Sequence, residues 1–150
     1  MTEIVYRDIV LRGKPLFMTK TKEALDYIET NAPRFLPFVV EHIGVIAHAV
    51  MVHGGHSGVD VYAKPPIFYV AHRTFAAGTS WYASCIVHDA THVKLYREGK
   101  PHSGREAEDI CLEHQKQFLT ESNSGQHHIK YIQHLIDDRV DYFSKRKRNW

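Results

Sequence analysis

The sequence predicts an α+β protein in which an N-terminal helix and a small mixed sheet are followed by three helices. Short segments rich in β-branched and aromatic residues, separated by Gly and Pro, occupy most of the first half of the chain. Longer segments with apolar residues at three- and four-residue steps occupy the second half. A chain in which the strands come first and the helices follow is typical of the α+β class.

The first half should contain one well-defined helix, over residues 20–30. Thr19 or Thr21 serves as its N-cap, and Asn31-Ala32-Pro33 ends it. Residues 35–41 are expected to form a helical turn that leads into a strand, and residues 53–58, rich in Gly, a loop. Strands are predicted over 3–12, 42–52, 59–62 and 67–71, with 74–78 as an extension of the last.

Helices are predicted over 79–98, 104–122 and 126–145. The last carries an apolar stripe suited to packing, made of Ile129, Ile132, Ile136, Val140 and Phe143. The sequence contains no internal repeat, linker or change of composition, so residues 1–150 are interpreted as a single domain with a sizeable core.

Composition narrows the class of protein. Hydrophobic residues make up 43% and charged residues 24%, as in ordinary soluble domains, and a net charge of +2 gives no reason to expect nucleic acid binding. The chain opens with charged residues and has no long apolar run, so we expect a soluble, cytoplasmic protein with no membrane partner. Cys85 and Cys111 are interpreted as buried free thiols, with a single disulfide as the alternative.

The centre of the second half is the motif His88-Asp89-Ala90-Thr91-His92. Residues four apart lie on the same face of a helix, so both imidazoles can reach one metal ion. The spacing is that of the metallopeptidase motif H-E-x-x-H, with Asp in place of Glu. Catalytic zinc takes three protein ligands and leaves a fourth position to water, so a third ligand must come from elsewhere.

The next predicted helix supplies four acids that could be this ligand: Glu106, Glu108, Asp109 and Glu113. Glu108 is preferred, because Glu108, Cys111, Gln115 and Phe118 share one helix face. Its distance along the chain from His92 also leaves room for a loop through Gly99-Lys100-Pro101 and a return across the first helix. Glu106 is the second choice.

The run W-Y-A-S-C-I-V-H-D-A-T-H, followed from Glu108 by E-x-x-C-x-x-x-Q-x-x-F-L, resembles gluzincin-type metallopeptidases. More narrowly, it is similar to small bacterial zincin-like domains. The resemblance covers about residues 67–150 and is most specific over 81–119. It implies a zincin-like fold in which an edge strand binds extended peptide above the active-site helix. It also implies His88, His92 and Glu108 as zinc ligands, with Asp89 in the position of the general base.

In such a site zinc activates a water molecule, and a carboxylate takes the proton and passes it to the leaving amine. Asp89 is one methylene shorter than the usual Glu, so the helix lies closer to the metal, or an extra water relays the proton, or activity is weak. Substrates would be peptides or proteins. Candidates for stabilising the transition state are Tyr96, His127, His128, Arg139 and Tyr142.

Two other functions compete with the peptidase interpretation. Val87-His88-Asp89 also resembles the His-Asp pair of HD-type phosphohydrolases, which implies that both His88 and Asp89 bind metal together with an upstream His on a helix and a downstream Asp. The upstream candidates are His48, His53 and His56, and the downstream candidates are Asp137, Asp138 and Asp141. The second alternative is a zinc-stabilised interaction module without catalytic activity.

Overall fold

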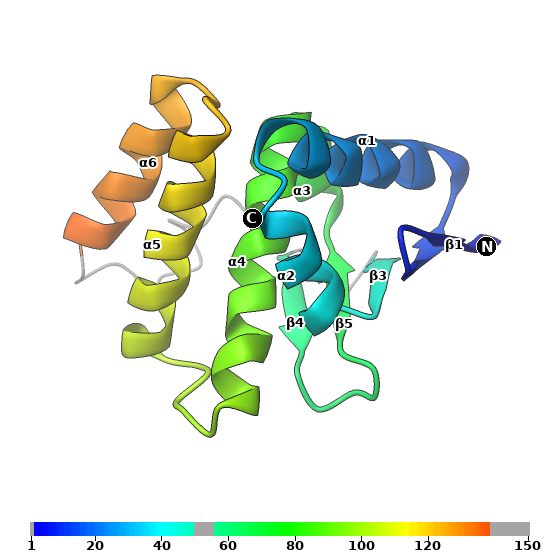
Figure 1. Ribbon diagram of the computed structural model, residues 1–150, viewed down its shortest axis with the longest axis horizontal. Coiled ribbons are helices and arrows are strands. Elements are labelled where there is room, and N and C mark those ends of the chain that lie inside the picture. Colours follow the sequence, from blue (N-terminus) through cyan, green and yellow to red (C-terminus); the bar gives the residue numbers. More distant parts are fainter. Residues whose placement is uncertain (1, 50–55, 139–150) are drawn as a thin grey trace.

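The computed structural model describes residues 2–49 and 56–138. Along the chain its elements are β1 (Thr2–Tyr6), β2 (Ile9–Gly13), α1 (Pro15–Asn31), α2 (Phe35–His42), β3 (Val45–His48), β4 (Gly58–Asp60), β5 (Ile67–Val70), α3 (His72–Ala76), α4 (Thr79–Arg97), α5 (Arg105–Glu121) and α6 (Gln126–Asp137). Figure 1 shows α4 in the centre, with α5 and α6 on one side and the sheet, α1 and α2 on the other. The α+β prediction is confirmed at this level.

The sheet is mixed, as predicted, and has the strand order β1-β2-β3-β5-β4. The three inner strands run parallel to one another, whereas each outer strand pairs antiparallel with its neighbour. Among the described residues β4 is therefore an antiparallel edge strand, paired through Val59 with Phe68 of β5. This edge lies against α4.

The N-terminal prediction of one strand over 3–12 was wrong, because the segment forms a β1–β2 hairpin. Arg7 and Asp8 at its tip have φ angles of +50° and +65°, the left-handed pair of a tight two-residue turn. Gly or Asn usually supplies this conformation, so Arg-Asp gave no turn signal. Helix α1 also starts five residues early, because Pro15 occupies its first turn instead of acting as a breaker.

Residues 35–52 contain more helix and less strand than predicted. Helix α2 ends at His42, and β3 runs only from Val45 to His48, while residues 50–52 lie outside the described part of the chain. The predicted strand extension over 74–78 was wrong as well, because α3 starts at His72. At the start of α3 the Ser57 hydroxyl accepts a hydrogen bond from the N–H of Ala71, and the N–H of Thr74 donates one to the carbonyl of Ala71.

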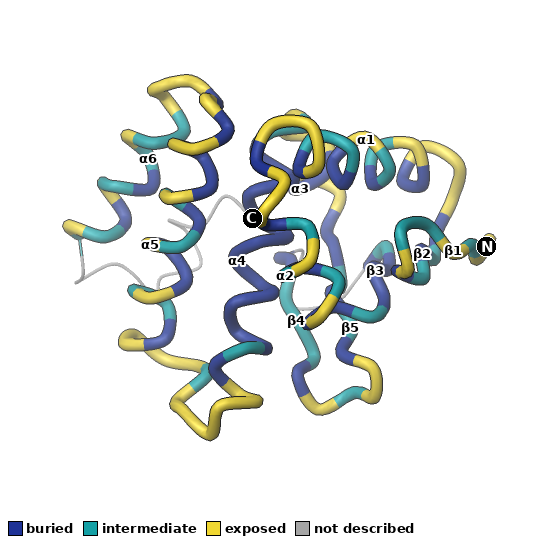
Figure 2. Tube along the Cα trace, in the orientation of Figure 1, coloured by how far each residue is buried: buried dark blue, intermediate teal, exposed yellow. Residues whose placement is uncertain are grey.

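Helix α4 confirms the prediction over 79–98 almost to the residue and is the most buried helix, as Figure 2 shows by its dark blue colour. It is packed between α5 and the α1, α2 and β4 side of the molecule. Its buried polar residues are Ser84, His88, Asp89, Thr91 and His92. Because burying polar groups is costly unless they are paired, their environment has to supply partners.

Helix α5 also matches its prediction, whereas α6 ends at Asp137 within the described residues. Positions 139–145 of the predicted last helix, and with them Val140 and Phe143, lie outside the described part.

Both cysteines are buried free thiols, as predicted. In the described part of the chain, no helix combines the length and the apolar character that a membrane crossing needs.

Candidate metal site

His88 and His92 lie next to each other on α4, with ring centroids 5.1 Å apart, and both side chains are buried. Glu108, in the first turn of α5, contacts both rings. Its Oε2 lies 3.2 Å from His88 Nε2 and its Oε1 lies 2.9 Å from His92 Nε2. Ligands of tetrahedral zinc lie about 3.3 Å apart when their bonds to the metal measure about 2.0–2.1 Å. The two distances between Glu108 and the histidines are therefore close to those expected between zinc ligands.

The orientation of the His92 ring is set by the loop between α4 and α5. Its Nδ1 lies 2.7 Å from the backbone carbonyl oxygen of His102. A carbonyl oxygen can only accept, so Nδ1 carries the proton and donates it. Nε2, the atom that faces Glu108, is left as the position for a metal ion.

A buried chain of hydrogen bonds fixes the His88 ring in the same way. The Ser84 hydroxyl donates its one proton to the Trp81 carbonyl at 2.7 Å, so it must accept the bond from Gln115 Nε2 at 2.9 Å. The amide of Gln115 is thereby oriented with Oε1 towards His88 Nδ1, at 2.8 Å. Nδ1 of His88 consequently donates, and its Nε2 points to Glu108.

This arrangement is the one that metal-binding histidines require. Histidine ligands donate their second ring N–H to a carbonyl or carboxylate, which fixes the tautomer and increases the basicity of the other nitrogen. In this protein the amide oxygen of Gln115 and the backbone oxygen of His102 have that role. Neither partner was identified from the sequence as a functional residue.

The charges at the site are strongly coupled. Burial raises the pKa of the Glu108 carboxyl, but the charge of His88 and hydrogen bonds from both histidines outweigh it and hold this pKa well below its usual range. Burial lowers the pKa of His92, but hydrogen bonds to Cys111 and Glu108 raise it well above its usual value. A buried carboxylate paired with imidazole protons is a place where a divalent cation can replace those protons.

Cys111 is the residue that sequence reasoning missed as a functional residue. It lies one turn after Glu108 on α5, is fully buried, and has a ligand atom within 4.8 Å of ligand atoms of both His88 and His92. The cluster of His88, His92 and Cys111 could hold a metal ion. The sequence contained a signal, because Cys111 shares the helix face of Glu108, but the cysteine was interpreted only as a buried thiol.

Asp89, the predicted general base, is buried next to His88 on α4. Its negative charge contributes to raising the pKa of the thiols of Cys85 and Cys111, after the larger effect of burial.

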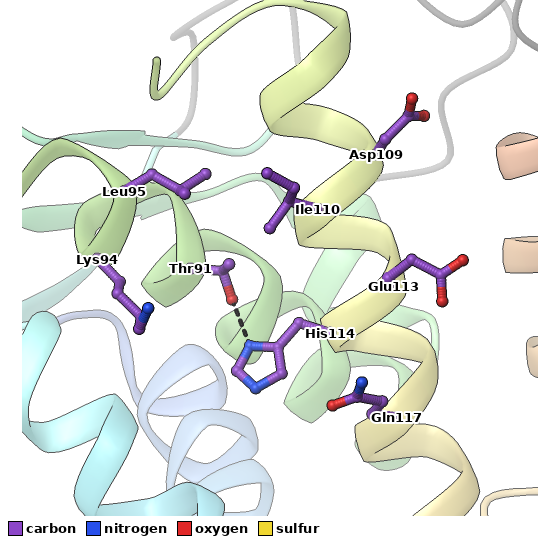
Figure 3. Close-up of a pocket in the computed structure, with 8 residues that line it drawn as sticks. All are labelled: Thr91, Lys94, Leu95, Asp109, Ile110, Glu113, His114 and Gln117. Atoms are coloured by element: carbon purple, nitrogen blue, oxygen red, sulfur yellow. Dashed lines mark hydrogen bonds between the residues drawn. The ribbon is translucent and has the colours of Figure 1, made fainter. Parts of the chain in front are cut away.

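The remaining acids of α5 are arranged differently from Glu108. Glu106 is exposed. Asp109 and Glu113 line a groove of about 420 Å³ with His114 and Gln117 of α5 and with Thr91, Lys94 and Leu95 of α4, and Figure 3 shows these side chains. Of the four acids considered, Glu108 is the one whose carboxylate contacts both histidine Nε2 atoms.

The predicted transition-state stabilisers fall into three groups. His127 and His128 lie at the start of α6 beside Trp81, which precedes His88 by seven residues, about 10 Å along the helix. That separation argues against a direct role at the metal. Tyr96 is nearer, with its ring 5.1 Å from the ring of His102. Arg139 and Tyr142 lie outside the described residues.

The residues that the phosphohydrolase alternative needs are found in other surroundings. His48 lies on β3, stacked at 5.3 Å on Phe17, whereas this alternative requires an upstream His on a helix. Asp137 accepts a hydrogen bond from Gln133 at the end of α6, and Asp138 lies beside His134. His56 precedes β4, and His53 and Asp141 lie outside the described residues.

No protein-family model, curated protein or solved structure matches this chain. The resemblance to gluzincin-type peptidases therefore stays a prediction that rests on the residues of 81–119.

Proposed function

We propose that this protein is a zinc-dependent hydrolase of the metallopeptidase type, with zinc bound by His88, His92 and Glu108 and with Asp89 as the general base. One observation carries the proposal: two buried imidazoles direct Nε2 at the same carboxylate while their Nδ1 atoms are held by oxygen acceptors. That combination, two histidines and a glutamate with carbonyl partners behind the histidines, is the ligand set of thermolysin-like zinc sites.

When bound, zinc would lower the pKa of a water molecule towards neutrality and polarise the carbonyl of the scissile bond. Asp89 would serve as the general base, which takes a proton from the attacking water and passes it to the leaving amine. Asp89 directly follows His88 on α4, and the burial of both residues strengthens electrostatic interactions at the site. A substrate must reach this site from the Glu108 side, since that ligand is less buried than the two histidines.

The sheet edge next to α4 suits a peptide substrate. Strand β4 ends the sheet among the described residues, pairs antiparallel with β5 and lies against α4. An edge strand offers backbone N–H and C=O groups with which an extended peptide can pair. This arrangement agrees with a zincin-like fold, in which such an edge binds the substrate above the active-site helix.

The test is hydrolysis of a mixed library of fluorescence-quenched peptides by zinc-loaded wild type, Asp89→Asn and Glu113→Gln. We expect Asp89→Asn to retain zinc and to lose about 10²–10⁴-fold in kcat, because it lacks the base. Glu113→Gln changes an exposed acid on the same helix as Glu108 and should behave as wild type. Zinc-loaded protein that cleaves no peptide, in wild type and in Cys111→Ala alike, would overturn the hydrolase proposal, as would an Asp89→Asn variant of unchanged activity.

A second candidate, a zinc-stabilised interaction module, is favoured by one observation. Cys111 stands within reach of both histidines, and structural zinc sites have four protein ligands. This module predicts bound zinc, no hydrolysis in any variant, and loss of folding stability when zinc is removed. Peptide hydrolysis by zinc-loaded Cys111→Ala separates the two functions, because the module predicts none.

A further inference from the structure

We infer that Cys111 is a fourth metal ligand and that its thiolate, instead of water, fills the fourth coordination position in the resting protein. The inference rests on the proposed zinc site of His88, His92 and Glu108 and adds a latent state to it. In this state Cys111 occupies the coordination position that the attacking water needs, so the hydrolase is inactive.

The geometry of α5 brings both further donors to the same place. Glu108 and Cys111 are three residues apart, so they lie on one face of the helix, and that face is packed against α4. Glu108 contacts both histidine Nε2 atoms, and Cys111 has its sulfur within 4.8 Å of a ligand atom of each histidine. The ligand atoms of Cys111 and the two histidines lie within 4.8 Å of one another, and the Glu108 carboxylate beside the histidines brings the donors to four, the number of ligands in a closed zinc site.

The surroundings of Cys111 favour sulfur over water in the fourth position. Its side chain is fully buried and forms a small apolar cluster with Leu95 and Ala107 at the edge of the site. Such surroundings offer a water molecule few hydrogen-bonding partners. A thiolate needs none, because its charge is neutralised by the metal.

Binding of the Cys111 sulfur to a metal ion involves the loss of one proton and no change of oxidation state. Cysteine binds a metal ion as the thiolate, so the thiol must lose its proton on ligation. On binding, the S–H bond breaks, the sulfur keeps the electron pair and donates it to the metal, and the proton leaves to solvent. Metal uptake should therefore release a proton from Cys111, and no oxidant or reductant is required.

The consequence for the proposed hydrolase is inhibition of the resting site. Water can enter the fourth position only when the thiolate leaves it. Rotation of the cysteine side chain to another staggered rotamer would move the sulfur by about 3 Å, which is enough to take it out of the coordination position. Replacing Cys111 by Ala should leave a three-ligand site that is permanently open.

The test uses zinc-loaded and cobalt-loaded protein, as wild type, Cys111→Ala, Cys111→Ser and Cys85→Ala. Cys85 is the matched control, since it is a buried cysteine on α4. X-ray absorption of the zinc-loaded wild type should show one sulfur at about 2.3 Å from the metal. The cobalt-loaded wild type and Cys85→Ala should show thiolate-to-cobalt charge-transfer absorption, which both Cys111 variants lose.

The outcomes separate this inference from the proposed function. The inference is supported if the Cys111 variants bind metal without the sulfur signal, and if Cys111→Ala cleaves peptides faster than wild type. Bound metal without sulfur in the wild type overturns the inference and leaves the three-ligand hydrolase standing. A sulfur signal together with no hydrolysis in either wild type or Cys111→Ala supports the ligand and overturns the hydrolase. Wild type that binds no metal overturns both.

Discussion

Gln115 offers the sharpest test of how the site is held, because it contacts His88 without being a metal ligand itself. Gln115→Leu conserves the approximate volume of a fully buried side chain and removes its hydrogen-bonding groups. The variant leaves the Nδ1–H of His88 without its acceptor and Ser84 Oγ without the bond it accepts. The change therefore isolates the hydrogen bonds from the packing.

Two magnitudes follow from these contacts. A buried donor left unsatisfied costs about 1–3 kcal/mol, and the lost bond at Ser84 adds to this, so the free energy of unfolding should fall by about 2–4 kcal/mol. Loss of the partner behind a histidine ligand weakens metal binding by about 10–100-fold. Gln115→Glu keeps an acceptor facing His88 and should recover much of the zinc affinity that Gln115→Leu loses, although it gives up the bond donated to Ser84.

The assays are competition for zinc with a chromophoric chelator and urea denaturation of the metal-free protein. Gln117→Leu is the control, because Gln117 is an exposed glutamine two positions further along the same helix. It should match wild type in both assays. Zinc affinity of Gln115→Leu within twofold of wild type would refute the role assigned to the chain Trp81, Ser84, Gln115 and His88.

Three further predictions concern the metal, pH and Tyr96. Removing zinc with a chelator should lower the free energy of unfolding by about 2.7 kcal/mol, relative to protein at a free zinc concentration of 100 times the Kd. An unchanged melting temperature in calorimetry would contradict this prediction. Burial, with smaller effects of Arg34 and Lys94, lowers the pKa of His114 from 6.5 to about 4. Between these pH values the unfolded chain binds more protons than the folded protein does. The free energy of unfolding of the metal-free protein should therefore decrease as the pH falls from 6.5 to 4. Urea titrations of wild type at both ends of this pH range should show that the free energy of unfolding falls by about 1–2 kcal/mol, a value already reduced for the partial exposure of the ring. The His114→Gln variant should not show this decrease. Tyr96→Phe should retain zinc and lower kcat in the peptide assay if the hydroxyl stabilises the transition state, and an unchanged kcat would exclude that role.

The helices that carry the site were predictable because their signals are local. Helices α4 and α5 are long and have clear apolar periodicity, and His88 and His92 need only the i, i+4 rule to share a face. The choice of Glu108 among four acids also followed from a helix face. Its contact with both histidines now supports that choice.

Other features depend on tertiary structure and could not be predicted in this way. The carbonyl of His102 holds His92 through backbone atoms in a loop, and a backbone contact has no side-chain signature. Gln115 and Cys111 were expected on the face of Glu108, but their roles depend on how closely α5 approaches α4. The β1–β2 turn was missed because its left-handed residues are Arg and Asp instead of Gly or Asn.

The central claim is a single metal ion held by His88, His92 and Glu108. Its most direct test is elemental mass spectrometry of protein purified without a metal-affinity tag, as wild type, His92→Ala, Glu108→Ala and Asp89→Ala. We predict close to one zinc per chain in wild type and in Asp89→Ala, and little or none in the other two variants. Wild type that contains no metal, even after zinc is supplied, would contradict the claim.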